Sequence, residues 1–245
     1  MIPKIVHYIW FGGKPYPEKI RYCIDSWKKY LPDYEFMLWN ENSFDVNSVP
    51  FTKQAFEHKK WAFVSDYVRV YALYKYGGWY LDTDNEICKP LTPFENHRMV
   101  LGTDDDGALT ALMGSERGHE LWRKILNYYE TMDFVREDGS LNMTVNNKYI
   151  EKLLFAYGFE NKNIYQTLSG GIEVYPDDYF HVVSFLTQKH HRTKNTYAIH
   201  WHTNLWLPKS SRFKRFIREK ILSPIIGAKN SANCFMLLNK LIRKK

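Results

Sequence analysis

Residues 61–84 read WAFVSDYVRVYALYKYGGWYLDTD, and this stretch decides the fold class. Its first part, residues 61–76, is apolar nearly all round and is followed by two glycines, which predicts a buried helix with a glycine stop. The next three residues, WYL, form a short apolar run that leads directly into the triplet DTD at 82–84, which predicts a strand ending in two carboxylates. A buried helix followed by a buried strand favours an α/β protein.

The same alternation continues on both sides of this stretch. Short apolar runs bounded by turn residues predict strands at 4–10, 34–39, 99–102, 172–175 and 196–201. Amphipathic patterns predict helices at 17–30, 116–132 and 143–157. We therefore expect an α/β fold with a central, mostly parallel sheet flanked by helices, in which ligands bind at the carboxyl ends of strands.

The composition is that of a folded protein. The chain has 245 residues, of which 44% are hydrophobic and 25% charged, so we expect one domain with a sizeable core, followed by a tail. The three cysteines are odd in number and far apart, which indicates neither a zinc site nor a disulfide framework. We expect neither secretion nor membrane spanning, because no signal peptide and no run of about 20 apolar residues is found.

The positive charge is concentrated at the C-terminal end. Residues 207–245 hold eleven Lys or Arg and one acid, a net charge of +10, and since the whole chain carries +7, the first 206 residues carry −3. This distribution indicates an anionic surface contacted by the tail, and it argues against a nucleic-acid groove through the fold. Four apolar residues of the tail share one helical face: Phe213, Phe216, Ile217 and Ile221. The tail is predicted to lie on an anionic membrane leaflet, and the alternative is a helix packed on the domain.

One polar stripe interrupts the apolar helix. Asp66 and Arg69 are three residues apart, and Ser65 and Arg69 four apart, so all three lie on one face. An internal ion pair is one explanation of the stripe. Because burying such a pair adds little net stability, a polar ligand is the interpretation we favour.

The carboxylates of Asp82 and Asp84 are two residues apart and point the same way if the strand continues through them. Oxygen ligands so placed can gather a hard divalent cation, although an isolated DxD is more often a solvated turn. Here the pair follows a buried helix that carries Arg69. This arrangement suits a metal-bridged diphosphate, because the cation neutralises the phosphates and the guanidinium supplies fixed donors.

Three segments resemble the family 32 glycosyltransferases, which are DXD-containing sugar transferases. They are IPKIVHYIWFGGKPYPE at 2–18, SDYVRVYALYKYGGWYLDTD at 65–84, and YPDDYF with NTYAIHWHTNLW between 175 and 206. The family includes bacterial capsular polysaccharide enzymes and is related to clostridial glucosylating toxins. The resemblance implies a GT-A type nucleotide-sugar-binding catalytic domain at 1–207 and a basic amphipathic tail at 208–245.

The resemblance also implies an activity. It predicts retaining transfer of a hexose from a nucleotide sugar, with a UDP-sugar favoured, to a growing surface polysaccharide or lipid-linked glycan, with Mn²⁺ or Mg²⁺ as cofactor. The expected location is the cytoplasm, peripheral on the inner face of the cell membrane. The alternatives are a catalytically inactive module that binds a nucleotide sugar or glycan, and a binder of anionic polymers that acts through the tail.

Roles for individual residues follow from the same resemblance. Trp10 matches an aromatic that stacks on the nucleotide base, its alternative being a core position. Asp66 and Arg69 match positions that hold the ribose and diphosphate. Asp84 is expected to contact the metal directly, and Asp82 to contact the ribose or sugar and to reach the metal through water. Arg69, Asp82 and Asp84 are thus the predicted catalytic residues.

The last matching segment, HWHTNLW at 200–206, departs from the family pattern. His202, favoured slightly over His200, is expected to complete the metal site, although either histidine can be structural. Trp206 is expected to close over the donor. Leu205 stands where relatives have Ser, and these departures motivate the inactive alternative.

The choice of sugar stays open. Thr110 stands where relatives often have Asn. The run Asp104-Asp105-Asp106 is either an exposed turn or a set of acceptors for hydroxyls of the donor sugar.

Overall fold

The computed structural model describes residues 1–104, 107–184 and 189–203, together with residues 205, 217, 227 and 230. The strands are β1 (Ile5–Ile9), β2 (Glu35–Trp39), β3 (Gly78–Leu81), β4 (Asn85–Ile87), β5 (Met99–Asp104), β6 (Gly107–Ser115), β7 (Gln166–Leu168), β8 (Ile172–Tyr175) and β9 (Ala198–His200). The α-helices are α1 (Glu18–Tyr30), α2 (Pro50–Glu57), α3 (Trp61–Tyr76), α4 (Glu120–Glu130), α5 (Asn146–Leu154) and α6 (Asp177–Phe180). Short 3-10 turns are η1 (Thr92–Phe94), η2 (Phe155–Tyr157) and η3 (Ser169–Gly171).

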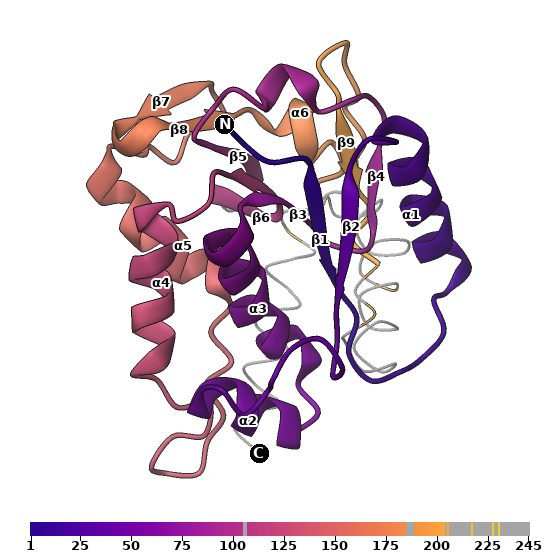
Figure 1. Cartoon of the computed structure of the whole chain (residues 1–245). Coiled ribbons are helices and arrows are strands. Elements are labelled where there is room, and N and C mark those ends of the chain that lie inside the picture. The colour runs from indigo at the N-terminus through magenta and orange to yellow at the C-terminus, as the bar shows by residue number, and fades with distance from the viewer. Residues whose placement is uncertain are drawn as a thin grey trace.

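A seven-stranded sheet forms the centre of the molecule, in the order β2-β1-β3-β6-β5-β8-β7 (Figure 1). Strands β1, β2, β3, β5 and β8 run in one direction, whereas β6 and β7 run in the opposite direction. A separate two-stranded sheet pairs β4 with β9. The predicted α/β fold with a mostly parallel central sheet is confirmed.

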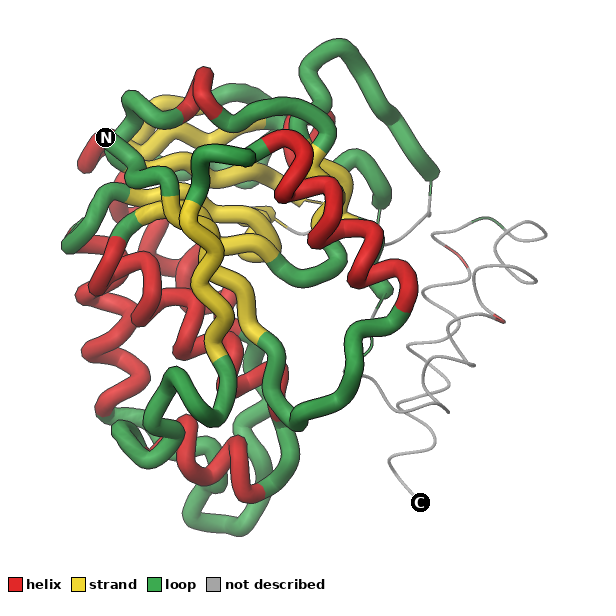
Figure 2. The backbone as a smooth tube through the Cα atoms, turned by 45° about the vertical axis from the view of Figure 1, so that its right-hand side comes forward, coloured by secondary structure: helices red, strands yellow, loops and turns green. Residues whose placement is uncertain are grey.

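Each face of the sheet buries its own apolar layer. Along β3, Tyr80 belongs to the layer that contains residues of α2, α3, α4 and α5. Trp79 and Leu81 point to the other face, into the layer that contains Trp27 of α1 and Phe180 of α6. This alternation follows from the two-residue period of a strand, and the strands lie between helices on both sides (Figure 2). None of the helices in the described part of the chain is long and apolar enough to cross a bilayer.

Most predicted elements are present with shifted ends, but five helices and strands were missed. Helices α2 and α6 and strands β4, β6 and β7 have no counterpart among the predictions. The most consequential is β6, because it lies between β3 and β5 in the sheet. Its sequence, GALTALMGS, is nearly all buried and contains Ala, Leu and Met, so neither alternation nor strand propensity marks it. The predicted tail helix and domain boundary at 207 lie outside the continuously described ranges.

The turn between α3 and β3 depends on its two glycines. Gly77 has φ +69° and Gly78 has φ +98°, values that side chains rarely adopt. A Cβ on Gly78 would lie 2.6 Å from the carbonyl oxygen of Ile5 in the neighbouring strand. The turn therefore fixes the approach of α3 to the sheet and the place where β3 begins.

We predict that Gly78→Ala destabilises the protein more than Gly139→Ala does. Gly139 also has positive φ (+76°), but a Cβ there meets nothing within 4 Å. The backbone conformation alone should cost roughly 1–2 kcal/mol in Gly139→Ala, and overpacking against Ile5 should add roughly 1–3 kcal/mol in Gly78→Ala. Urea denaturation of both variants measures the difference, and equal losses would contradict the collision with Ile5.

A neutral histidine lies inside the sheet. His7 of β1 is fully buried, its Nδ1 accepts from the indole of Trp39 at 3.2 Å, and its Nε2 lies 2.8 Å from the carbonyl oxygen of Gly77. Burial lowers the pKa of His7 from 6.5 to about 4, although the Gly77 carbonyl opposes the change. Protonation of Nδ1 would place its N–H against the indole N–H of Trp39, so that two hydrogen-bond donors would face each other.

We predict that acid weakens the fold through His7. Between pH 6.5 and about 4 the unfolded chain binds a proton at this position that the folded chain does not. The free energy of unfolding should therefore fall as the pH is lowered through this window, by about 3 kcal/mol. His7→Asn cannot titrate, so its urea-unfolding free energy should fall less over the same range. An identical pH dependence in both proteins would assign the effect to other groups.

Candidate functional site

Several strand ends bring polar residues to one edge of the central sheet. Strands β1, β3 and β5 run in the same direction, so their carboxyl ends meet at the same edge. Trp10 follows β1, Asp82 follows β3, and Asp104 ends β5. Strand β6 returns beside β3, and its Ala111 carbonyl accepts from the Asp82 amide at 2.8 Å. The predicted clustering of acids at strand ends is therefore present among the described residues.

Arg69 of α3 is a buried cation between two carboxylates. Its guanidinium lies 3.3 Å from Asp66 Oδ1 and 3.6 Å from Asp82 Oδ1. It also donates to the Thr110 carbonyl of β6 at 3.1 Å, and its Cζ lies 4.6 Å from the ring centroid of Tyr80. These contacts tie α3, β3 and β6 together at the sheet edge.

Asp66 and Asp82 differ in their surroundings. Burial raises the pKa of Asp66 to about 6, against the lowering effects of Arg69 and of the Asn146 amide, which donates to Oδ2 at 3.1 Å. The side chain of Asp66 is 9% exposed, whereas that of Asp82 is 27% exposed. The Tyr80 hydroxyl donates a hydrogen bond to Asp82 Oδ1 at 2.5 Å. The internal pair of the polar stripe is present in the structure: Arg69 pairs with Asp66 and also reaches the more open Asp82, while a polar ligand at this stripe stays a prediction.

Asp84 is held by the segment that follows β9. Its Oδ2 accepts from the backbone amide of Thr203 at 2.7 Å and from the Thr203 hydroxyl at 2.8 Å. Its Oδ1 lies 3.3 Å from His200 Nε2, which is also 3.9 Å from Asp82 Oδ2. One imidazole thus faces both carboxylates of the DxD pair.

The charges of Asp84 and His200 stabilise each other. Burial alone would raise the pKa of Asp84, but His200 and the two Thr203 donors outweigh it and hold the pKa below its usual range. Burial likewise disfavours the charged form of His200, but Asp84, Asp82 and Asp104 together raise its pKa. A metal ion that binds through His200 at this position must therefore displace the Nε2 proton.

The ligand atoms of Asp82, Asp84 and His200 are arranged in a way that suits a divalent cation. One ligand atom from each residue lies within 4.8 Å of the other two. Carboxylates suit Mg²⁺ and Mn²⁺, whereas an imidazole suits transition metals. The structure places His200, rather than the favoured His202, against both aspartates. His202 Nε2 instead lies 3.0 Å from the Val183 carbonyl oxygen.

The remaining predicted residues are distributed as follows. Trp10 is only partly buried, its indole donates to the Lys14 carbonyl at 2.6 Å, and its ring lies 5.0 Å from that of Tyr16. Trp10 is thus not a core residue. Leu205 is exposed, and three residues lie outside the described part of the chain: Asp105, Asp106 and Trp206.

Three residues of the site were not singled out from the sequence. Tyr80 was assigned only to an apolar strand, Asn146 begins α5 and binds Asp66 from 80 residues away, and Thr203 binds Asp84 from 119 residues away. The spacing of Tyr80 from Asp82 was the one local signal, because residues two apart on a strand point the same way. Asn146 and Thr203 had no such signal.

We predict that Arg69→Met destabilises the fold by roughly 3–5 kcal/mol, because it leaves the buried Asp66 without its cation. Adding Asp66→Asn to that variant should restore part of the loss, since a neutral amide needs no counter-charge. Arg98→Met, which breaks the more exposed pair with Glu116, is the matched control and should cost less than about 1 kcal/mol. Urea denaturation gives all three values. A double variant no more stable than Arg69→Met would contradict the coupling.

Parts of this chain resemble known proteins. Residues 17–104 match the family described as "Glycosyltransferase sugar-binding region containing DXD motif". Inositol phosphoceramide mannosyltransferase 3 of Schizosaccharomyces pombe is 34% identical over 127 residues, which cover 48% of this chain and 34% of that protein. Inositol phosphoceramide mannosyltransferase 2 of the same yeast is 29% identical over 135 residues, covering 53% of this chain and 39% of that protein.

The chain thus spans between about 34% and 39% of the length of these curated relatives. Among solved structures, the PaToxG glycosyltransferase aligns with a TM-score of 0.47 and 20% identity, over 63% of this chain and 68% of that one.

Proposed function

We propose that this protein is a metal-dependent glycosyltransferase that moves a hexose from a nucleotide sugar to a glycan acceptor. The observation that carries the proposal is the convergence of Asp82, Asp84 and His200, whose ligand atoms lie within 4.8 Å of one another beside the buried Arg69. The family match over residues 17–104 supports it, because this range contains the DxD pair and Arg69.

The proposed roles follow from the contacts. Asp84, Asp82 and His200 hold the divalent cation, which supplies charge neutralisation of the departing diphosphate. Arg69 lies 3.6 Å from Asp82 and is fixed by Asp66 and Thr110, so its position is set before the donor binds. Such fixed charges stabilise a leaving group without reorganisation during the reaction.

Trp10 is proposed to stack on the base of the nucleotide. It follows β1, whose neighbour β3 runs parallel and leads to Asp82, so both residues stand at the same sheet edge. Its ring is partly exposed, as a stacking platform requires. We favour a UDP-sugar and retention of the anomeric configuration, with the departing diphosphate helping to deprotonate the acceptor hydroxyl, so that no protein nucleophile is needed.

The acceptor is proposed to be a surface polysaccharide or a lipid-linked glycan. The relatives named as inositol phosphoceramide mannosyltransferases support a lipid-borne acceptor and add a mannose donor to the candidates. The basic residues 208–245 would hold the enzyme at an anionic inner leaflet on the cytoplasmic side.

We predict metal-dependent release of nucleoside diphosphate from one member of a panel of UDP- and GDP-sugars, including GDP-mannose. With Mn²⁺ present, Asp84→Asn should reduce the release by about 100-fold or more, because it removes a charge from the cation site. Asp25→Asn is the matched control: Asp25 pairs with Lys28 at an exposed site, so its loss should leave the rate unchanged.

The assay also separates the alternatives. Thermal stabilisation by one donor without release, even with glycan acceptors added, would favour the inactive binding module. Neither release nor stabilisation would contradict a donor site at Asp82 and Asp84. Truncation after Pro208 should leave donor hydrolysis intact if the tail serves only to bind an anionic surface.

A further inference from the structure

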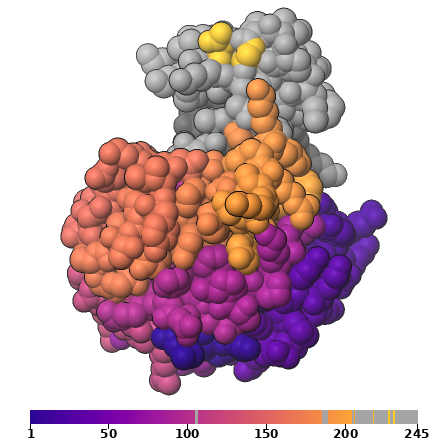
Figure 3. All heavy atoms as spheres, turned by 90° about the horizontal axis from the view of Figure 1, so that it is seen from above, coloured from indigo at the N-terminus to yellow at the C-terminus, as the bar shows by residue number. Residues whose placement is uncertain are grey.

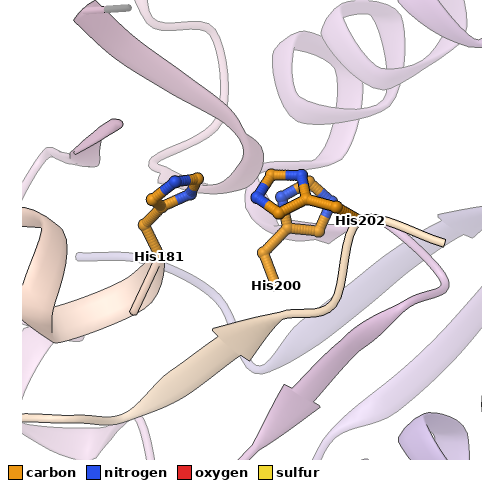
Figure 4. Close-up of side chains that lie close together, drawn as sticks. All are labelled: His181, His200 and His202. Atoms are coloured by element: carbon orange, nitrogen blue, oxygen red, sulfur yellow. The ribbon is translucent and has the colours of Figure 1, made fainter. Parts of the chain in front are cut away.

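Three histidines from two separate segments converge beside the DxD pair. His181 directly follows α6, His200 ends β9, and His202 lies on the segment after β9 (Figure 4). One nitrogen from each ring lies within 4.8 Å of the other two. The ring centroids are 3.9 Å apart for His200 and His202, and 4.9 Å apart for His181 and His202. We call this set the three-histidine cluster.

The backbone around the cluster adopts uncommon conformations. Val182 has φ +55° and His202 has φ +50°, both in the left-handed region. Histidine enters this region more readily than most non-glycine residues, whereas a β-branched residue such as valine is a genuine outlier there. The His200 amide also donates to the His181 carbonyl at 3.4 Å, which joins the two segments. Backbone strain of this kind is typical of places where side chains must be held for a function.

Two of the imidazoles have the hydrogen bonds of metal ligands. A histidine that binds a metal through one nitrogen usually donates its other N–H to a carboxylate or a carbonyl. His200 Nε2 lies 3.3 Å from Asp84 Oδ1, and its buried Nδ1 has no hydrogen-bond partner among the residues that the structure describes. His202 Nε2 lies 3.0 Å from the Val183 carbonyl oxygen, which places its proton on Nε2 and its lone pair on Nδ1.

We propose that the three-histidine cluster is a second cation site, which lies beside the DxD pair, has His200 in common with it and is suited to a zinc-type transition metal. Three neutral imidazoles leave a fourth tetrahedral position for water, the ligand pattern that Zn²⁺ accepts. The oxygen-rich DxD pair suits Mn²⁺ or Mg²⁺ instead. Residues 189–203, which include His200 and His202, are orange in Figure 3, and β9 within this range pairs with β4 from the middle of the chain.

The two sites share His200. A neutral imidazole has one lone pair, so when Nδ1 binds a metal in the cluster, Nε2 keeps its proton and donates to Asp84. An ion in the cluster would therefore take His200 from the Asp82–Asp84–His200 set proposed above and leave the DxD cation with the two carboxylates. The inference stands without the proposed function, because metal binding is measured without any sugar transfer.

The test uses Co²⁺ added to the metal-free protein, because tetrahedral Co²⁺ absorbs visible light strongly whereas octahedral Co²⁺ absorbs weakly. We expect one equivalent to produce strong bands. His181→Gln should weaken this binding by more than about 100-fold, since losing even the outer hydrogen-bond partner of a ligand costs roughly 10- to 100-fold. Asp82→Asn should retain the bands, and so should the control His190→Gln, which removes a nearby exposed imidazole outside the cluster.

Two results would overturn the proposal. The first is the absence of strong bands in the unaltered protein. The second is bands lost in Asp82→Asn but kept in His181→Gln, which would place the ion at the DxD pair. If His181→Gln fails to fold, X-ray absorption of the zinc-loaded unaltered protein decides: three imidazole ligands support the cluster, and a shell of mostly carboxylate oxygens contradicts it.

Discussion

A permanent positive charge inside the protein is the constraint on which the arrangement of the sheet edge depends. Arginine does not release its proton, so the fold must supply compensating groups wherever Arg69 is buried. It does so with Asp66 from the same helix, Asp82 from the end of β3 and the Thr110 carbonyl from β6. Moving β3 away from α3 would separate Asp82 from Arg69, and this cost favours a fixed position of Asp82 at the edge of the sheet.

The second organising contact joins two segments that lie 119 residues apart in the sequence. Asp84 is bound by Thr203 and faces His200, so the short strand β9 is fixed against β4 and against the DxD pair. The Asp84 carboxylate is therefore surrounded by hydrogen-bond donors from Thr203 and His200 even when no metal ion is bound. The candidate site and the stability of this part of the fold use the same hydrogen bonds.

The sequence was informative where a pattern is local. The buried helix α3, its glycine stop and the strand before the DxD pair follow from periodicity and turn residues, and the structure has all three. Strand β6 could not be recognised, because a strand buried on both faces has no alternation of polar and apolar residues.

The spacing of the histidines could not show that His200, rather than His202, faces both aspartates. His202 has a positive φ, and its Nε2 lies against the Val183 carbonyl oxygen. This conformation depends on contacts with residues 181–183, which are distant in the sequence.

The separation of Asp84 from Thr203 by 119 residues also bears on how the protein is made. A ribosome releases the N-terminal part first, and α3 with its neighbouring strands can associate while later residues are still being added. The ligand set around Asp84 is incomplete until the chain has been extended past residue 203 and that segment has returned across the molecule. Contacts between such distant residues form slowly, because the closure of a long loop precedes any gain from the contact. Products of early termination would thus have much of the sheet but not the assembled ligand set.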